Sequence, residues 1–148
     1  MAAPFLSIKT ILREAELVSQ DQFETWTQQW RTAVEGGSED TMLEFFSREK
    51  GVTDEQFLKQ LADALKWPFV DLQSLSIASE IRSRISTKVA FQYGIMPAFE
   101  EDGVLLIAVS NPFTAGMLNA VQYEASGPVR YGLATAVEID KALKKYYG

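Results

Sequence analysis

The side chains of this chain that could do chemistry are mainly carboxylates, because its 148 residues include no histidine and no cysteine. Thiol nucleophiles and the Ser-His-Asp triad are therefore excluded, as are zinc sites built from Cys and His. Three carboxylates follow one another at Glu100, Glu101 and Asp102, and they could bind a cation or a basic partner. Adjacent carboxylates on a turn rarely converge on one ion, so we interpret them as a solvated hairpin tip. The sequence predicts no catalytic residue and no metal site.

ATP chemistry would need a further motif. A phosphate-binding loop has the pattern Gly-x4-Gly-Lys-Ser/Thr, in which backbone amides and the lysine hold the phosphates. The sequence contains no Gly-Lys pair. We therefore expect that this chain is not an enzyme and that it holds no cofactor of its own.

Two tryptophans are candidates for binding a protein partner. Phe23, Trp26 and Trp30 recur at helical spacing and form an aromatic stripe. Aromatic residues are enriched among the anchors of protein interfaces, so Trp26 and Trp30 are candidate partner-binding residues. The alternative, which is the more common one for such a stripe, is that it forms the core seam of an N-terminal helical hairpin.

Basic side chains give a second set of candidates. Arg82, Arg84 and Lys88 are close in the sequence, and Arg130 could join them from a later strand. They could pair with an acidic surface of a partner and would then affect the rate and the salt dependence of association. The alternative is a solvated helix face that binds nothing.

Charge and hydropathy restrict the class of partner. The formal net charge is −6 at pH 7, so there is no excess of Lys and Arg to neutralise nucleic-acid phosphates. No apolar run approaches the roughly 20 residues that a membrane span needs, and the first residues lack the apolar core of a signal peptide. We expect a cytoplasmic protein without direct membrane insertion, which could still reach a membrane through a partner.

The elements that must position these side chains are centred on one hairpin. Residues 95–99 and 104–109 are apolar runs joined by a four-residue turn, 100–103, that contains glycine. The second run is apolar throughout, so we expect it to be a central strand buried on both faces. A helix over 113–125, a strand over 129–134 and a helix reaching Tyr147 follow. The expected fold is α+β, with a small mixed three-stranded sheet in the order β-β-α-β-α, packed with helices.

Four helices are expected before Trp67, and capping boxes mark two of them, at Ser19–Gln22 and Thr53–Gln56. Two short helices or turns, over 77–85 and 86–93, are expected between them and the hairpin. Residues 13–23 (REAELVSQDQF) resemble residues 48–57 (REKGVTDEQF), which suggests two related helical hairpins. Gly36 and Gly37 interrupt the pattern. We therefore expect an N-terminal helical subdomain over 1–35, a flexible linker over 36–38 and a compact α+β domain over 39–148.

Several stretches of the chain resemble a known family. Residues 51–72 contain GVTDEQFL and LKWPFVDL, residues 93–112 contain YGIMP and LLIAVSNP, and residues 138–148 read EIDKALKKYYG. Together they resemble the N-terminal domain of the type II secretion and type IV pilus assembly ATPases, of the general secretory pathway protein E type. The resemblance implies a role in bacterial protein transport.

The same resemblance implies partners. The family's motor is a hexameric inner-membrane ATPase whose catalytic domain lies downstream of this region, so ATP and Mg are expected only in that downstream domain. The N-terminal domain docks the motor to the cytoplasmic domain of a bitopic inner-membrane secretion protein. By resemblance, the chain is a docking and regulatory domain that lies in the cytoplasm, peripheral to the inner membrane through its partner.

A second function is open, because some members of this family bind cyclic di-GMP through a motif repeated near the N-terminus. That motif has an Arg-Leu-Gly start, a later Gly and a distal Gln. Here Ser7-Ile8-Lys9 stands at the start of the first copy, Glu16 at the later Gly and Trp30 at the distal Gln. The second copy keeps Gly51 but starts with Met42-Leu43-Glu44. Without the arginine and the first glycine we do not expect nucleotide binding.

Overall fold

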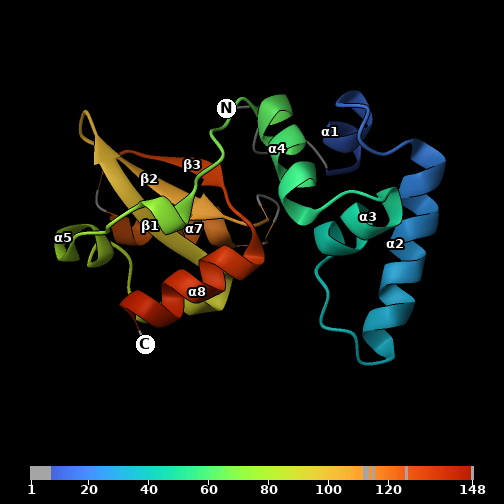
Figure 1. Ribbon diagram of the computed structural model, residues 1–148. Helices are drawn as coiled ribbons and strands as arrows, with labels where there is room; N and C mark the ends of the chain where they lie inside the picture. Colours follow the sequence, from blue (N-terminus) through green and yellow to red (C-terminus); the bar gives the residue numbers. More distant parts are fainter. Residues whose placement is uncertain (1–7, 112–113, 115, 126, 148) are drawn as a thin grey trace. The chain divides into compact units, whose positions relative to one another are not determined.

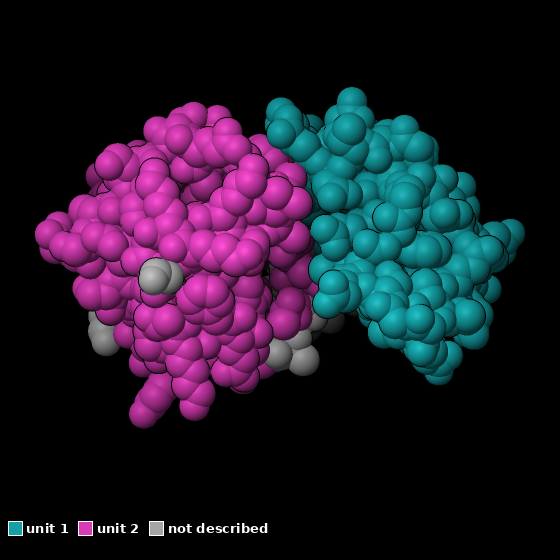
Figure 2. All heavy atoms as spheres, turned by 60° about the horizontal axis from the view of Figure 1, so that its bottom comes forward, with its two compact units in different colours: residues 1–66 teal, residues 67–148 magenta. Residues whose placement is uncertain are grey.

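The computed structural model describes residues 8–111, 114, 116–125 and 127–147 (Figure 1). It divides the chain into two units, residues 1–66 and 67–148, which Figure 2 shows in different colours. Each unit is described below by itself. None of the described helices is both long enough and apolar enough to span a membrane.

The first unit consists of helices. They are α1 (Ile8–Glu14), α2 (Gln20–Glu35), α3 (Met42–Lys50) and α4 (Asp54–Leu65). The core of the unit is apolar and includes Leu12, Leu43, Phe46, Phe57 and Leu61, each at most 3% exposed. Burial of this kind stabilises a side chain by about 1.5–3 kcal/mol, which explains why the short helices are held together.

Capping boxes begin three of the four helices. The two predicted boxes are present: Ser19 and Gln22 exchange hydrogen bonds of 3.0 and 3.1 Å, and Thr53 and Gln56 do the same. A third box joins Thr41 to Glu44 at the start of α3 and was not predicted. Each reciprocal pair satisfies two backbone N–H groups that a helix start leaves free.

The division between the units differs from the predicted linker at 36–38. α3 packs against both α2 and α4, so residues 39–66 belong to the same unit as α1 and α2. The Nε1 of Trp30 also donates a hydrogen bond of 2.8 Å to the carbonyl oxygen of Asp40, across the turn at Gly36 and Gly37. The chain crosses from one unit to the other after Lys66, which ends α4 in a left-handed conformation, φ 59°.

The second unit has the predicted α+β architecture. Its elements are η2 (Leu72–Ser74), α5 (Ser79–Arg82), α6 (Thr87–Tyr93), β1 (Ile95–Glu101), β2 (Val104–Val109), α7 (Met117–Ala125), β3 (Val129–Leu133) and α8 (Ala136–Tyr146). The strand order is β1-β2-β3, with β1 antiparallel and β3 parallel to β2. The mixed three-stranded sheet predicted from the sequence is confirmed.

The hairpin turn is shorter than predicted. Glu100 and Glu101 are the last residues of β1, so only Asp102 and Gly103 form the loop. Both have positive φ, 53° and 80°, which is the conformation of a type I′ turn. An Asp-Gly pair favours that turn because its twist matches the twist of the strands. The two glutamates are thereby fixed on a strand.

The strand β2 is the centre of the sheet, as predicted. Its residues 105–109 are all 0% exposed. Figure 1 shows α8 on the near side of the sheet and α7 behind it. α7 begins at Met117, later than the predicted 113, and residues 113 and 115 lie outside the described part.

One edge of the sheet is closed by the segment after α4. The backbone N–H of Val70 donates to the carbonyl oxygen of Leu133 (2.7 Å), and the N–H of Leu133 donates to the carbonyl oxygen of Pro68 (2.9 Å). The segment 68–70 makes one parallel bridge to β3, between Phe69 and Leu133. Gly132 lies against this segment, and a Cβ there would be 2.7 Å from Cγ2 of Val70 and 2.9 Å from the oxygen of Pro68.

We therefore expect Gly132→Ala to lower the free energy of unfolding by about 1–3 kcal/mol, because backbone and side-chain atoms must move to admit the methyl group. The control is Gly36→Ala, whose Cβ would meet its nearest atoms at 3.5 and 3.6 Å and should cost nothing measurable. Urea unfolding followed by circular dichroism measures both. An unchanged unfolding midpoint for Gly132→Ala would show that the edge contact is not tight.

Candidate functional site

The aromatic stripe of α2 lies against α3. The Phe23 ring meets the Phe46 ring edge-on, with centroids 5.8 Å apart, and the Trp26 ring lies 5.9 Å from the same ring. Phe46 is fully buried, whereas Phe23, Trp26 and Trp30 are each half-buried. The stripe therefore forms part of the helical seam and also presents aromatic surface to solvent.

Asp40 fixes the end of this stripe. Its carbonyl oxygen accepts the hydrogen bond from Trp30, and its carboxylate forms an ion pair with Arg48 of α3. The hydrogen bond from Arg48 lowers the pKa of the Asp40 carboxyl. The loop between α2 and α3 thus holds one tryptophan through its backbone and one arginine through its side chain.

The four basic candidates do not form one cluster. Arg84 donates to both Glu100 (2.9 Å) and the carbonyl oxygen of Ala125, which its Nε and Nη2 reach at 3.1 and 2.7 Å. Arg130 pairs with Glu101 at 3.2 Å. Two of the predicted partner-binding cations are therefore paired with the carboxylates of the hairpin. The sequence analysis treated the basic residues and the hairpin carboxylates as separate groups, because Arg84 and Glu100 are 16 residues apart.

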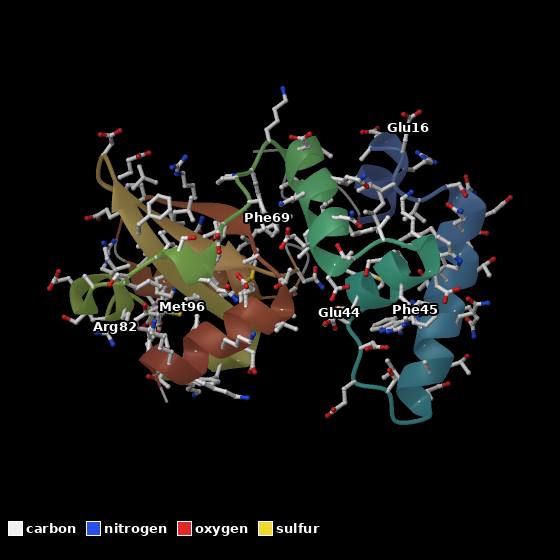
Figure 3. The ribbon with its side chains drawn as sticks, viewed as in Figure 1. Glu16, Glu44, Phe45, Phe69, Arg82 and Met96 are labelled. Carbon is white, nitrogen blue, oxygen red and sulfur yellow. The ribbon has the colours of Figure 1, made fainter. Side chains whose placement is uncertain are left out.

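Arg82 is held at the end of α8. Its guanidinium carbon lies 5.3 Å from the centroid of the Tyr146 ring, and Nη1 donates to the carbonyl oxygen of Tyr146 (3.2 Å). Figure 3 labels Arg82 on α5. Its Nε is buried and has no hydrogen-bond partner in the described part of the chain. Lys88, on α6, is exposed.

A second tyrosine secures the same junction. The Tyr147 hydroxyl donates to the carbonyl oxygen of Arg82 (2.7 Å), and its single proton can be shared with the carbonyl oxygen of Ile85 (3.2 Å). Both tyrosines thus join the end of α8 to the region of α5. Burial raises the pKa of Tyr147 to about 12, so the hydroxyl stays protonated further into alkaline pH than an exposed tyrosine would. Sequence reasoning did not single out Tyr146 or Tyr147, because their partners lie more than 60 residues away.

The first unit contains two equivalent turns, as the repeat in the sequence suggests. Glu16 after α1 and Gly51 after α3 both adopt the left-handed conformation, with φ 60° and 80°. Figure 3 labels Glu16 in its turn. A hollow of about 490 Å³ lies beside them, and Glu16, Lys50, Gln60 and Asp63 line it. The Nζ of Lys50 donates to the carbonyl oxygen of Leu17 at 2.7 Å.

This hollow is poorly suited to a phosphate group. Glu16 and Asp63 place two carboxylates at its wall, against the single ammonium of Lys50, which already has an acceptor. The predicted start of the first nucleotide motif falls at 7–9, where residue 7 lies outside the described part. Within the described residues, no group of three or more carboxylates is placed to hold a metal ion.

Comparison with protein-family models gives one match. The model of the MshEN domain matches residues 65–148, which is more than half of the chain. No curated protein matches the chain significantly.

Solved structures share the fold. A structure of MshE with cdg is similar with a TM-score of 0.73 and 17% identity, covering 96% of this chain and 99% of that one. Two structures of the N-terminal domain of XpsE are similar with TM-scores of 0.58 and 0.56. The first has 23% identity, covering 76% of this chain and 79% of that one, and the second has 20%, covering 96% and 98%.

Arg84 and Arg130, which both pair with glutamates of β1, should contribute differently to the free energy of unfolding. We expect Arg84→Met to lower the free energy of unfolding by about 1–3 kcal/mol, because it removes two donors from the buried Ala125 carbonyl. Arg130→Met should cost less than about 1 kcal/mol, since its side chain is 47% exposed and that of Glu101 65%. Chemical unfolding of both variants makes the comparison. Equal losses would mean that the carbonyl contact contributes nothing.

Proposed function

Because this chain belongs to the MshEN domain family, the N-terminal domain of type II secretion and type IV pilus ATPases, we propose that it is a non-catalytic docking and regulatory domain. It couples a downstream hexameric ATPase to the cytoplasmic domain of a bitopic inner-membrane protein of the secretion machine. ATP and Mg then belong to the downstream domain. The chain works at the inner membrane through this partner.

The observation that supports docking is the exposure of the aromatic residues of α2. None of its 16 residues is buried, although three of them are Phe23, Trp26 and Trp30. In the same unit, α4 buries four of its residues over a shorter length. Half-exposed aromatic side chains held in place by packing are typical of interface anchors, because they are already ordered before a partner binds. We propose that Trp26 and Trp30 contact the partner.

The basic candidates have a smaller part in this proposal. Arg84 and Arg130 already have carboxylate partners, so a protein that used them would have to break those pairs. Lys88 is exposed on α6 and remains available at the rim of a contact. A rim charge of this kind changes the association rate and its salt dependence more than the affinity.

We expect the chain to bind the purified cytoplasmic domain of the bitopic partner with a Kd no weaker than tens of micromolar, measured by isothermal titration calorimetry. Trp26→Leu/Trp30→Leu should weaken binding by about tenfold or more, because leucine keeps apolar packing but removes the aromatic surface. Thermal unfolding of the variant tells a lost contact from a lost fold.

The matched control is Arg31→Gln, an exposed residue of the same helix outside the stripe, which should bind like the unchanged chain. Absence of binding by the unchanged chain at tens of micromolar would overturn the docking proposal. Equal affinity of the folded double variant would exclude the stripe as the contact.

A nucleotide-sensing role is the second candidate, because the chain shares its fold with MshE, whose structure is described as containing cdg. An identity of 17% supports the fold alone. The residues argue against cyclic di-GMP: Glu16 and Asp63 would face its phosphates if it entered the hollow of the first unit.

We therefore expect calorimetric titration of the full chain with cyclic di-GMP to be flat at up to about 100 µM. Among single substitutions, Glu16→Gly should favour nucleotide binding most, because it removes a carboxylate from the hollow and restores the family's glycine. Saturable heat from the unchanged chain would make sensing the better proposal.

A further inference from the structure

We propose that the second unit carries a binding surface for an acidic segment of a protein partner, centred on Tyr146 and lined by Arg82, Lys141 and Lys145. We call it the Tyr146 surface. The inference rests on the proposed docking function and specifies the chemistry of what is docked. It replaces the predicted cluster of Arg82, Arg84, Lys88 and Arg130 with a set that the fold brings together.

The ring of Tyr146 is fixed and has two cations close to it. The Nζ of Lys145 lies 5.2 Å from the ring centroid and the guanidinium carbon of Arg82 lies 5.3 Å from it. Both distances are in the range of cation–π attraction. The ring is anchored at its tip, since its hydroxyl accepts a hydrogen bond from the N–H of Ile77 (3.3 Å) and donates to the carbonyl oxygen of Leu75 (3.4 Å). Two positive charges are thereby held around one residue.

A hollow lies beside the tyrosine on the side of η2. It measures about 170 Å³, and Gln73, Lys141, Lys145 and Tyr146 are among the residues that line it. Lys141 and Lys145 are four residues apart on α8 and so lie on the same side of the helix. A carboxylate entering this hollow would meet two ammonium groups.

A second hollow lies between α5 and the end of α8. It measures about 310 Å³ and is lined by Arg82, Tyr146 and Tyr147 together with hydroxyl side chains. Those hydroxyls belong to Ser79, Ser83, Ser86 and Thr87. Because Tyr146 borders both hollows, a segment lying across it can place acidic side chains in each. Hydroxyl and ammonium donors suit carboxylate acceptors.

Carboxylates of the chain itself offset only part of this charge. Among the described residues, none forms an ion pair with Arg82, Lys141 or Lys145, whereas the neighbouring Lys144 pairs with Asp140 at 2.9 Å. Two carboxylates border the surface. Glu138 lines the first hollow, and Glu124 accepts hydrogen bonds from Ser86 at 2.7 and 2.9 Å. The three cations outnumber these two carboxylates, so the surface keeps a small positive excess in a chain of net charge −6.

The same net charge favours a protein segment over other polyanions. A membrane or nucleic acid presents extended negative charge, which the acidic remainder of the chain would repel. A short acidic segment needs only the local cations and can enter two small hollows. We therefore assign the surface to a peptide rich in Glu or Asp.

The test uses fluorescence anisotropy of a fluorescein-labelled decapeptide of alternating Glu and Ser, at low salt. Lys141→Gln/Lys145→Gln should raise its Kd by about tenfold or more. The matched control is Lys59→Glu, on α4 in the other unit, which changes the net charge by the same amount and should leave the Kd within about twofold. A labelled Lys-Ser decapeptide should not bind. Circular dichroism confirms that each variant is folded.

Four outcomes separate the possibilities. No binding of the acidic peptide, or equal loss in both variants, overturns the Tyr146 surface. Binding to phosphatidylglycerol vesicles that needs Lys141 and Lys145, without peptide binding, also overturns it in favour of a lipid surface. If the membrane partner's cytoplasmic domain binds the unchanged chain and the double variant equally, docking stands and the Tyr146 surface is wrong as its contact. If the peptide binds as expected but that domain does not, the surface stands and the docking proposal fails.

Discussion

Burial of the strand β2 on both faces is the constraint on which the second unit depends. Five consecutive side chains, residues 105–109, are removed completely from water, and each face then needs a cover of its own. α8 supplies one cover and α7 the other (Figure 1). α8 buries Ile139, Ala142 and Leu143, and its lysines at 141, 144 and 145 lie on the exposed side of the helix. The lysines of α8 are therefore exposed, because the opposite side of the same helix covers the buried strand β2.

Sequence reasoning succeeded where the relevant residues are neighbours in the chain. The buried strand, the hairpin and the caps at Ser19 and Thr53 are each written within a few consecutive residues, and the structure contains all of them. It did not find contacts such as Arg82 with Tyr146, 64 residues apart, because no local pattern encodes them. For the same reason the basic residues were grouped by proximity in sequence, whereas Arg84 and Arg130 are held by the two glutamates of β1.

The two helical hairpins of the first unit show how one repeat yields two roles. Phe23 in α2 and Phe57 in α4 follow their capping boxes at the same distance, yet only Phe57 is fully buried. α4 continues with further apolar residues on its inner side, while α2 carries Thr27 and Gln28 at the corresponding places. α4 therefore contributes more to the core than α2, which presents part of its aromatic surface to solvent.

The closed sheet edge at Gly132 affects how copies of this unit can pair with one another. A free strand edge is a template on which a second copy can add its own strand, and the risk grows when many copies are held close together. Here the segment at 68–70 occupies the β3 edge, and Pro97 in the outer strand β1 lacks an N–H to offer. The β3 edge is therefore closed to a strand from a second copy, and the β1 edge has one donor fewer at Pro97. Gly132 allows the segment 68–70 to lie close to β3, and in this way it helps to prevent strand pairing between copies at that edge.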